Sequence, residues 1–177
     1  LATFPISGQW LDYLKDQKDF LKSLPYEIRK KVLLRLFPSD LGWDQISRWK
    51  DDMPEVMIDT GKKNIRKLIK NSRIYISTYN ATTYLESLSW NIPTIIFWNP
   101  NHWELKKEVE PYFELLKSVG VFHETPESAA QKMIDVWNDI SSWWYSEKLQ
   151  TARQQFCKQF SRNNCTLAED LKKIFKN

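Results

Sequence analysis

Glycine is scarce in this chain of 177 residues, and its scarcity excludes two familiar kinds of phosphate site. Only four glycines occur, where an average composition would give about twelve. They stand far apart, at Gly8, Gly42, Gly61 and Gly120. The dinucleotide signature G-x-G-x-x-G and the phosphate loop G-x-x-x-x-G-K-[ST] both need clustered glycines, so neither is present. A phosphate site in this chain would have to use hydroxyl side chains and the N–H groups at the start of a helix.

Cysteine and histidine are also rare, which excludes a zinc site built on these residue types. The chain has Cys157, Cys165, His102 and His123, and these four do not stand at ligand spacing. Two cysteines eight residues apart are typical of reduced thiols in a cytoplasmic protein. No apolar run approaches the length of a membrane-spanning helix, and no signal-peptide pattern occurs. We therefore predict a cytoplasmic protein without a metal or other cofactor.

Charge of one sign does not dominate. Lys and Arg number 26 against 22 Asp and Glu, and the net charge of +4 is spread along the chain. The one dense group of cations, in residues 62–70, is typical of a solvated helix face. A nucleic-acid partner is therefore not predicted. Nine tryptophans are scattered without a repeat period, and we expect most of them in the core.

Apolar, partly β-branched runs alternate with helical patterns along most of the chain. The runs predict five strands, at 31–37, 55–59, 73–78, 94–98 and 121–123. The helical patterns lie at 10–24, 44–49, 64–70, 81–90, 105–118, 126–140, 146–160 and 167–175. Such alternation is typical of a parallel sheet covered on both faces. We predict one α/β domain over residues 1–177, with a Rossmann-like parallel sheet of about five strands flanked by helices and a helical C-terminal coat.

The segment that leads from the third predicted strand into the next helix carries the clearest chemistry. In sheets of this class, ligands bind beyond the carboxyl ends of the strands. Hydroxyl and amide side chains gather there, and we predict a phosphate site formed by Ser77, Asn80, Thr82 and Thr83. Glu86 follows about one turn later and is placed to accept hydrogen bonds from ribose hydroxyls. An alternative stays open, in which Asn80 is only an N-cap and Thr83 and Glu86 form a capping box.

Several motifs resemble those of known transferases. Residues 76–86, followed by Asn-Ile-Pro-Thr-Ile-Ile-Phe at 91–97, resemble the donor-binding motif of GT-B glycosyltransferases. A closer resemblance, over nearly the whole chain, is to a family of bacterial transferases of surface-carbohydrate biosynthesis. It rests on four separated segments, at 35–38, 42–43, 99–104 and 125–129. GT-B enzymes have two Rossmann-like domains around a cleft, so the resemblance implies that this chain is the C-terminal, donor-binding half and a fragment of a longer chain.

The resemblance also implies roles for single residues. Thr82 and Thr83, together with Asn80, would hold the phosphate or diphosphate of the donor, and Glu86 would bind the ribose. Arg35 would be a cation near the phosphates, and His102 would lie near the donor sugar. The catalytic base is not identified in this chain.

Two departures from the family pattern leave the nucleotide open. Related polymer transferases that use CMP- or CDP-linked donors carry His-Pro where Phe37 and Pro38 stand here. They also carry paired serines where Ala81 and Thr82 stand.

The hypothesis is therefore the donor nucleotide-sugar-binding domain of a glycosyltransferase in bacterial surface polysaccharide or glycan biosynthesis, acting without an obligate metal. Its partners would be the nucleotide-sugar donor, the missing N-terminal acceptor domain of the same chain, and the cytoplasmic membrane surface. The chain alone would bind the donor and transfer no sugar. Two alternatives stay open: a sugar-nucleotide epimerase of the same architecture, and a non-enzymatic interaction module with a tryptophan-rich surface.

Overall fold

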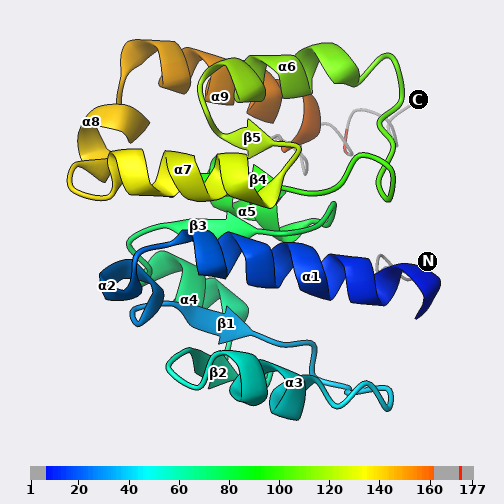
Figure 1. Ribbon diagram of the computed structural model, residues 1–177. Coiled ribbons are helices and arrows are strands. Elements are labelled where there is room, and N and C mark those ends of the chain that lie inside the picture. Colours follow the sequence, from blue (N-terminus) through cyan, green and yellow to red (C-terminus); the bar gives the residue numbers. More distant parts are fainter. Residues whose placement is uncertain (1–6, 162–171, 173–177) are drawn as a thin grey trace.

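The computed structural model describes residues 7–161 and residue 172, in which helices and short strands alternate (Figure 1). The helices are α1 (Ser7–Ser23), α2 (Tyr26–Arg29), α3 (Gln45–Asp52), α4 (Ile65–Lys70), α5 (Thr83–Ser89), α6 (Glu110–Ser118), α7 (Pro126–Val136), α8 (Ile140–Trp144) and α9 (Glu147–Phe160). The strands are β1 (Leu33–Arg35), β2 (Met57–Asp59), β3 (Tyr75–Ser77), β4 (Thr94–Phe97) and β5 (Phe122–His123). All five predicted strands therefore occur, and each is shorter than predicted.

The observed helices differ from the predicted ones in several places, and α2 was not predicted at all. The helix expected at 126–140 ends at Val136. A separate helix, α8, begins at Ile140, where the side chain of Asp139 accepts a hydrogen bond from the backbone N–H of Ser142. The helix expected at 105–118 begins only at Glu110, with Pro111 in its first turn. The helix expected at 167–175 lies outside the described residues, apart from residue 172.

All strand pairs are parallel, as predicted, but they form two sheets rather than one. β1 pairs with β2, and Arg35 lies opposite Asp59. The second sheet has the order β3-β4-β5, with Ile96 of β4 opposite Phe122 of β5. The prediction of a parallel α/β arrangement is confirmed, whereas the prediction of a single five-stranded Rossmann-like sheet is wrong.

Side chains, rather than backbone hydrogen bonds, hold the two sheets together. β1 and β3 are each three residues long, so pairing them would add few ladder hydrogen bonds. Leu34 and Ile58 from the first sheet and Ile76 from the second pack against the same hydrophobic cluster. The burial of this apolar surface joins the sheets without a shared ladder.

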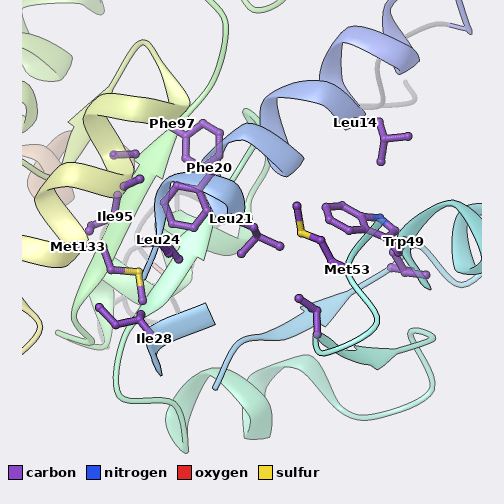
Figure 2. Packing of buried hydrophobic residues seen from close by; sticks show 14 of the residues in the cluster. Leu14, Phe20, Leu21, Leu24, Ile28, Trp49, Met53, Ile95, Phe97 and Met133 are labelled. Carbon is purple, nitrogen blue, oxygen red and sulfur yellow. The ribbon is translucent and has the colours of Figure 1, made fainter. Parts of the chain in front are cut away.

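Helix α1 supplies the centre of that cluster. Figure 1 shows α1 lying between α7 and the part of the chain that holds β1, β2 and α3. Phe20 of α1 stacks on Phe97 of β4 with ring centroids 5.1 Å apart (Figure 2). Trp49, within α3, and Met53, just after it, belong to the same cluster on the side of Leu21 (Figure 2). One helix therefore packs against both sheets.

A second cluster lies on the opposite face of β4, because successive strand residues point to opposite faces. This aromatic cluster contains Tyr84, Leu88, Ile96, Trp98, Phe113, Leu116, Val121, Phe122, Trp144, Leu149 and Phe156. Phe113 meets Phe122 and Phe156 edge to face, with ring centroids 5.1 and 5.2 Å apart. All four residues of β4 are buried, as expected for a central strand covered on both faces.

The C-terminal helices cover the second sheet and hold the end of α5. The indole Nε1 of Trp144 donates to the carbonyl of Asn91 and to its side-chain oxygen, at 3.1 and 2.9 Å. Asn91 lies two residues after the end of α5 and has a positive φ of 56°, a conformation that asparagine tolerates well. Arg153 donates to the carbonyl of Leu88 at 2.8 Å, and the Ser161 hydroxyl donates to that of Leu85 at 2.9 Å. The predicted helical coat is therefore present through Ser161.

Candidate functional site

The loop between β3 and α5 contains most of the predicted phosphate-binding residues. Ser77 is buried at the end of β3, and its hydroxyl donates to the carbonyl of Tyr79 at 3.3 Å. Thr82 is exposed, and Thr83 is half-buried at the start of α5. Among the described residues, the backbone N–H groups of Thr82, Thr83 and Tyr84 and the Thr82 hydroxyl have no hydrogen-bond partner. These groups are able to donate to an anion, whereas α5 has only seven residues and adds little dipole.

The capping roles that the sequence left open are not formed. The N-cap of α5 is Thr82, and its side chain makes no capping hydrogen bond. The side-chain oxygen of Asn80 instead accepts a hydrogen bond from the Tyr84 hydroxyl at 3.0 Å. Glu86 does not bond back to the start of the helix, because its Oε1 accepts from Arg66 at 2.8 Å. The capping alternative for Asn80, Thr83 and Glu86 is therefore wrong.

Glu86 faces α4, where Arg66 holds one of its carboxylate oxygens. The side chains of Glu86 and Arg66 are 34% and 64% exposed, so solvent screens the pair. The second oxygen, Oε2, has no hydrogen-bond partner among the described residues. Glu86 thus keeps an acceptor that a hydroxyl group can reach.

Two of the predicted residues, Ser77 and Thr83, lie beside the buried phenol of Tyr75. Burial raises the pKa of Tyr75 to about 12, and hydrogen bonding with Ser77 and Thr83 opposes that rise in part. The phenol therefore stays protonated at neutral pH and remains a hydrogen-bond donor. Ser77 and Thr83, separated by five residues in the sequence, are brought together here.

Arg35 is bound more closely by the protein than the sequence indicated. Its Nη1 donates to Asp59 Oδ2 at 2.6 Å and to the carbonyl of Lys63 at 2.8 Å, and its Nη2 donates to the carbonyl of Gly61 at 2.9 Å. The Asp59 carboxylate is only 3% exposed. Gly61 has φ +82°, and an added Cβ would lie 2.6 Å from Pro38 Cγ, so the loop after β2 packs directly on the loop after β1. Arg35 therefore has a structural role, and its Nε–H remains for an external anion.

A cavity of about 130 Å³ lies between α1, β1 and α3. The loop after β1 and Tyr79 of the loop after β3 also line it. Aromatic side chains form much of its wall, from Trp10, Tyr13, Trp43, Trp49 and Tyr79. Trp10 and Trp43 pack together with ring centroids 4.8 Å apart. Arg35 also lines the cavity, so a guanidinium and several rings border one space.

Three polar residues that the sequence analysis did not select connect α1 to the loop. The Tyr13 hydroxyl and Thr78 Oγ1 are 2.8 Å apart, and Gln17 Nε2 donates to both oxygens, at 2.7 and 2.9 Å. Burial raises the pKa of Tyr13, so its hydroxyl stays protonated. A signal was present in the sequence: Tyr13 and Gln17 interrupt the apolar stripe of α1 at a spacing of one turn.

His102 lies in the loop after β4 and is turned toward α1. Its side chain is 10% exposed, and its Nε2 lies 3.9 Å from Asp12 Oδ2. Its Nδ1 is buried and has no hydrogen-bond partner among the described residues. The ring meets Trp103 edge-on at 6.0 Å. The structure thus places His102 beside Asp12 of α1.

An open hollow lies beside the segment that contains His102. Carboxylates and amides line it, among them Asp16, Asn99, Glu124 and Glu127. Burial raises the pKa of Asp16, and the nearby His102 opposes that rise. Side chains of this kind hydrogen-bond hydroxyl groups.

Two further findings concern metals and membranes. Within residues 7–161, no three His, Cys, Asp or Glu side chains are grouped so that they share a metal ion. None of the helices that the structure describes combines the length and apolar character needed to cross a bilayer.

The chain was also compared with known proteins. The family model described as LIC12162 family transferase matches residues 1–175. No curated protein and no solved structure matches the chain. Since the family match covers almost the full sequence, the chain belongs to the LIC12162 family of transferases.

Proposed function

We propose that this transferase binds a nucleotide-sugar donor at the carboxyl ends of β1 and β3 and serves sugar transfer in bacterial surface polysaccharide or glycan assembly. One observation carries the proposal: a loop with unpaired N–H and hydroxyl donors borders a cavity walled by aromatic rings. Tyr79 lines the cavity and directly precedes the loop residues 80–83. A ligand with a flat ring at one end and phosphates next to it fits both parts.

Each part of a nucleotide sugar has a chemical counterpart at this site. Phosphate oxygens accept hydrogen bonds from the N–H groups and hydroxyls of Thr82 and Thr83. The free oxygen of Glu86 accepts from a ribose hydroxyl. The Nε–H of Arg35 adds a charged donor at the edge of the cavity. Ser77 and Asn80 shape the loop through their bonds to Tyr79 and Tyr84.

The donor sugar is assigned to the side of the site toward β4. The loop after β4 carries His102, and the hollow beside it is lined by carboxylates and amides. These groups suit a hydroxyl-rich ring, because each hydroxyl both donates and accepts hydrogen bonds. His102 is proposed as a neighbour of the sugar and not as the catalytic base.

The chain's role in the reaction is to position the donor and to stabilise the leaving group. In the transfer, the bond between the anomeric carbon and the donor phosphate oxygen breaks, and a bond to the acceptor oxygen forms. The phosphate keeps the electron pair, so negative charge grows where the loop donors lie. The acceptor hydroxyl loses its proton to a base that we assign, with the acceptor, to a second domain.

The test compares a double variant at the loop with a matched control. We expect Thr82→Ala with Thr83→Ala to weaken nucleotide binding by about 1–3 kcal/mol, because charge-assisted hydrogen bonds to phosphate are lost. Thr151→Ala, on an exposed position of α9, removes a hydroxyl far from the loop and should leave the affinity unchanged. Calorimetric titration of the three proteins with UDP, CDP, CMP and GDP gives the affinities.

Two outcomes would contradict the proposal. Equal affinities in the double variant and the wild type would show that phosphate does not bind this loop. If none of the four nucleotides raises the melting temperature at millimolar concentration, the protein is not a donor-binding domain, and an interaction module takes its place.

A further inference from the structure

Three parts of the chain form the aromatic wall of the cavity. α1 contributes Trp10 and Tyr13, the segment around α3 contributes Trp43 and Trp49, and Tyr79 stands at the loop. Trp10 and Trp49 are 6% and 1% exposed, so these walls are fixed by the core. Buried side chains therefore fix part of the cavity wall.

The size of the cavity limits what enters it. Its volume is about 130 Å³, and an engineered cavity of about 150 Å³ in another protein accommodates one benzene ring. A single six-membered ring fits such a space, whereas the fused rings of a purine need considerably more. We propose that this cavity takes the base of the donor and that the base is a pyrimidine, uracil or cytosine. This inference rests on the proposed function, because it places one part of the same nucleotide.

The walls have the chemistry that a pyrimidine requires. Bases stack on aromatic side chains, and the indoles of Trp10 and Trp43 form a tilted pair beside the space. Gln17 uses its Nε2 for Tyr13 and Thr78, while its side-chain carbonyl has no hydrogen-bond partner among the described residues. Gln17 also lines the cavity. Its carbonyl oxygen is thus an acceptor for the N3–H of uracil or the amino group of cytosine.

The cavity and the phosphate loop are connected by two consecutive residues. Thr78 is bound to the cavity wall through Tyr13, at 2.8 Å, and Tyr79 is itself part of the wall. The next residues, 80–83, carry the donors proposed for phosphate. The proposed places for the base and for the phosphates therefore adjoin along the chain.

Competition among nucleotides that share a diphosphate tests the base alone. We expect UDP or CDP to bind the wild-type protein at least tenfold more tightly than GDP and ADP. Binding of the pyrimidine should also quench tryptophan fluorescence, because three indoles line the cavity. Trp43→Ala enlarges the cavity, and we expect the ratio of pyrimidine to purine affinity to fall below threefold in this variant. Trp137→Ala is the matched control, since Trp137 is also half-buried but does not line the cavity, and it should keep the wild-type ratio.

The outcomes separate this inference from the proposed function. If GDP or ADP binds wild type as tightly as UDP and CDP, while the loop double variant still loses affinity, the phosphate site stands and the base lies outside the cavity. If no nucleotide and no pyrophosphate binds, the proposed function fails and the inference fails with it. The wild-type ratio decides the matter even if circular dichroism shows that Trp43→Ala does not fold.

Discussion

The two sheets differ in how completely their surroundings are packed. Around β3, β4 and β5, rings meet edge to face, and β4 is buried along its whole length. Around β1 and β2, Leu33 and Met57 are exposed in register opposite each other, and a buried carboxylate is held by Arg35. The cavity also lies on this side. The comparison indicates that one part supplies rigidity, while the less completely packed part keeps the space and the polar groups that a ligand needs.

The largest difference between the two parts should appear in stability. Phe156 is fully buried and contacts Tyr84, Phe113 and Phe160, so we expect Phe156→Ala to lower the free energy of unfolding by about 3–5 kcal/mol. Leu33→Ala, at a side chain that is 39% exposed, should cost about 0.5 kcal/mol or less. Urea denaturation of both variants measures the two values. Equal losses would show that the two parts are packed alike.

The second prediction concerns the buried charge of the less packed part. Removing the guanidinium in Arg35→Gln leaves the Asp59 carboxylate buried without its partner, which should cost about 3 kcal/mol. Adding Asp59→Asn removes that charge, and we expect the double variant to recover at least half of the loss. Urea denaturation of the single and double variants measures the recovery. A double variant as unstable as Arg35→Gln would mean that the carbonyl contacts of Arg35, and not the ion pair, hold the strand ends together.

The smallest effect is expected where the two parts meet, at Glu86. Glu86→Gln should leave the melting temperature nearly unchanged, because its ion pair with Arg66 is exposed to solvent. It should reduce the preference for a ribonucleotide over its 2′-deoxy analogue several-fold, or about 1 kcal/mol. Calorimetric affinities for both nucleotides, on wild type and variant, give this ratio.

Arg66→Gln is the matched control for Glu86→Gln. It breaks the same ion pair but keeps the carboxylate, so the ratio between ribo and deoxy affinities should stay as in the wild type. An unchanged ratio in Glu86→Gln would assign the ribose contact to another residue.

Local signals predicted the order of the strands and of most helices, but not how the strands assemble. Runs such as 94–97 are apolar and bounded by turn residues, and periodicity is enough to find them. α1 packs against both sheets, although β3 and β4 lie far from it in the sequence. No local pattern encodes that arrangement.

The site was predictable to a similar extent. The hydroxyl-rich loop between β3 and α5 could be predicted from the sequence, because its residues form one continuous segment. The partners of its neighbours are far away: Arg66 reaches Glu86 over 20 residues, and Tyr13 reaches Thr78 over 65. The cavity likewise brings together Trp10 and Tyr79. Contacts between residues so far apart in the sequence follow from tertiary packing alone.

The long-range hydrogen bonds that hold α5 have a consequence for protein synthesis. The carbonyls of Leu85 and Leu88 in α5, and of Asn91 just after it, accept hydrogen bonds from Ser161, Arg153 and Trp144. These donors lie 53 to 76 residues further along the chain. On the ribosome, the loop at the start of α5 emerges long before these partners do. The helix that carries the loop therefore lacks these hydrogen bonds until the chain through Ser161 has left the exit tunnel. The helix that carries the proposed ligand site in the middle of the sequence is thus held by a segment close to the end of the described residues.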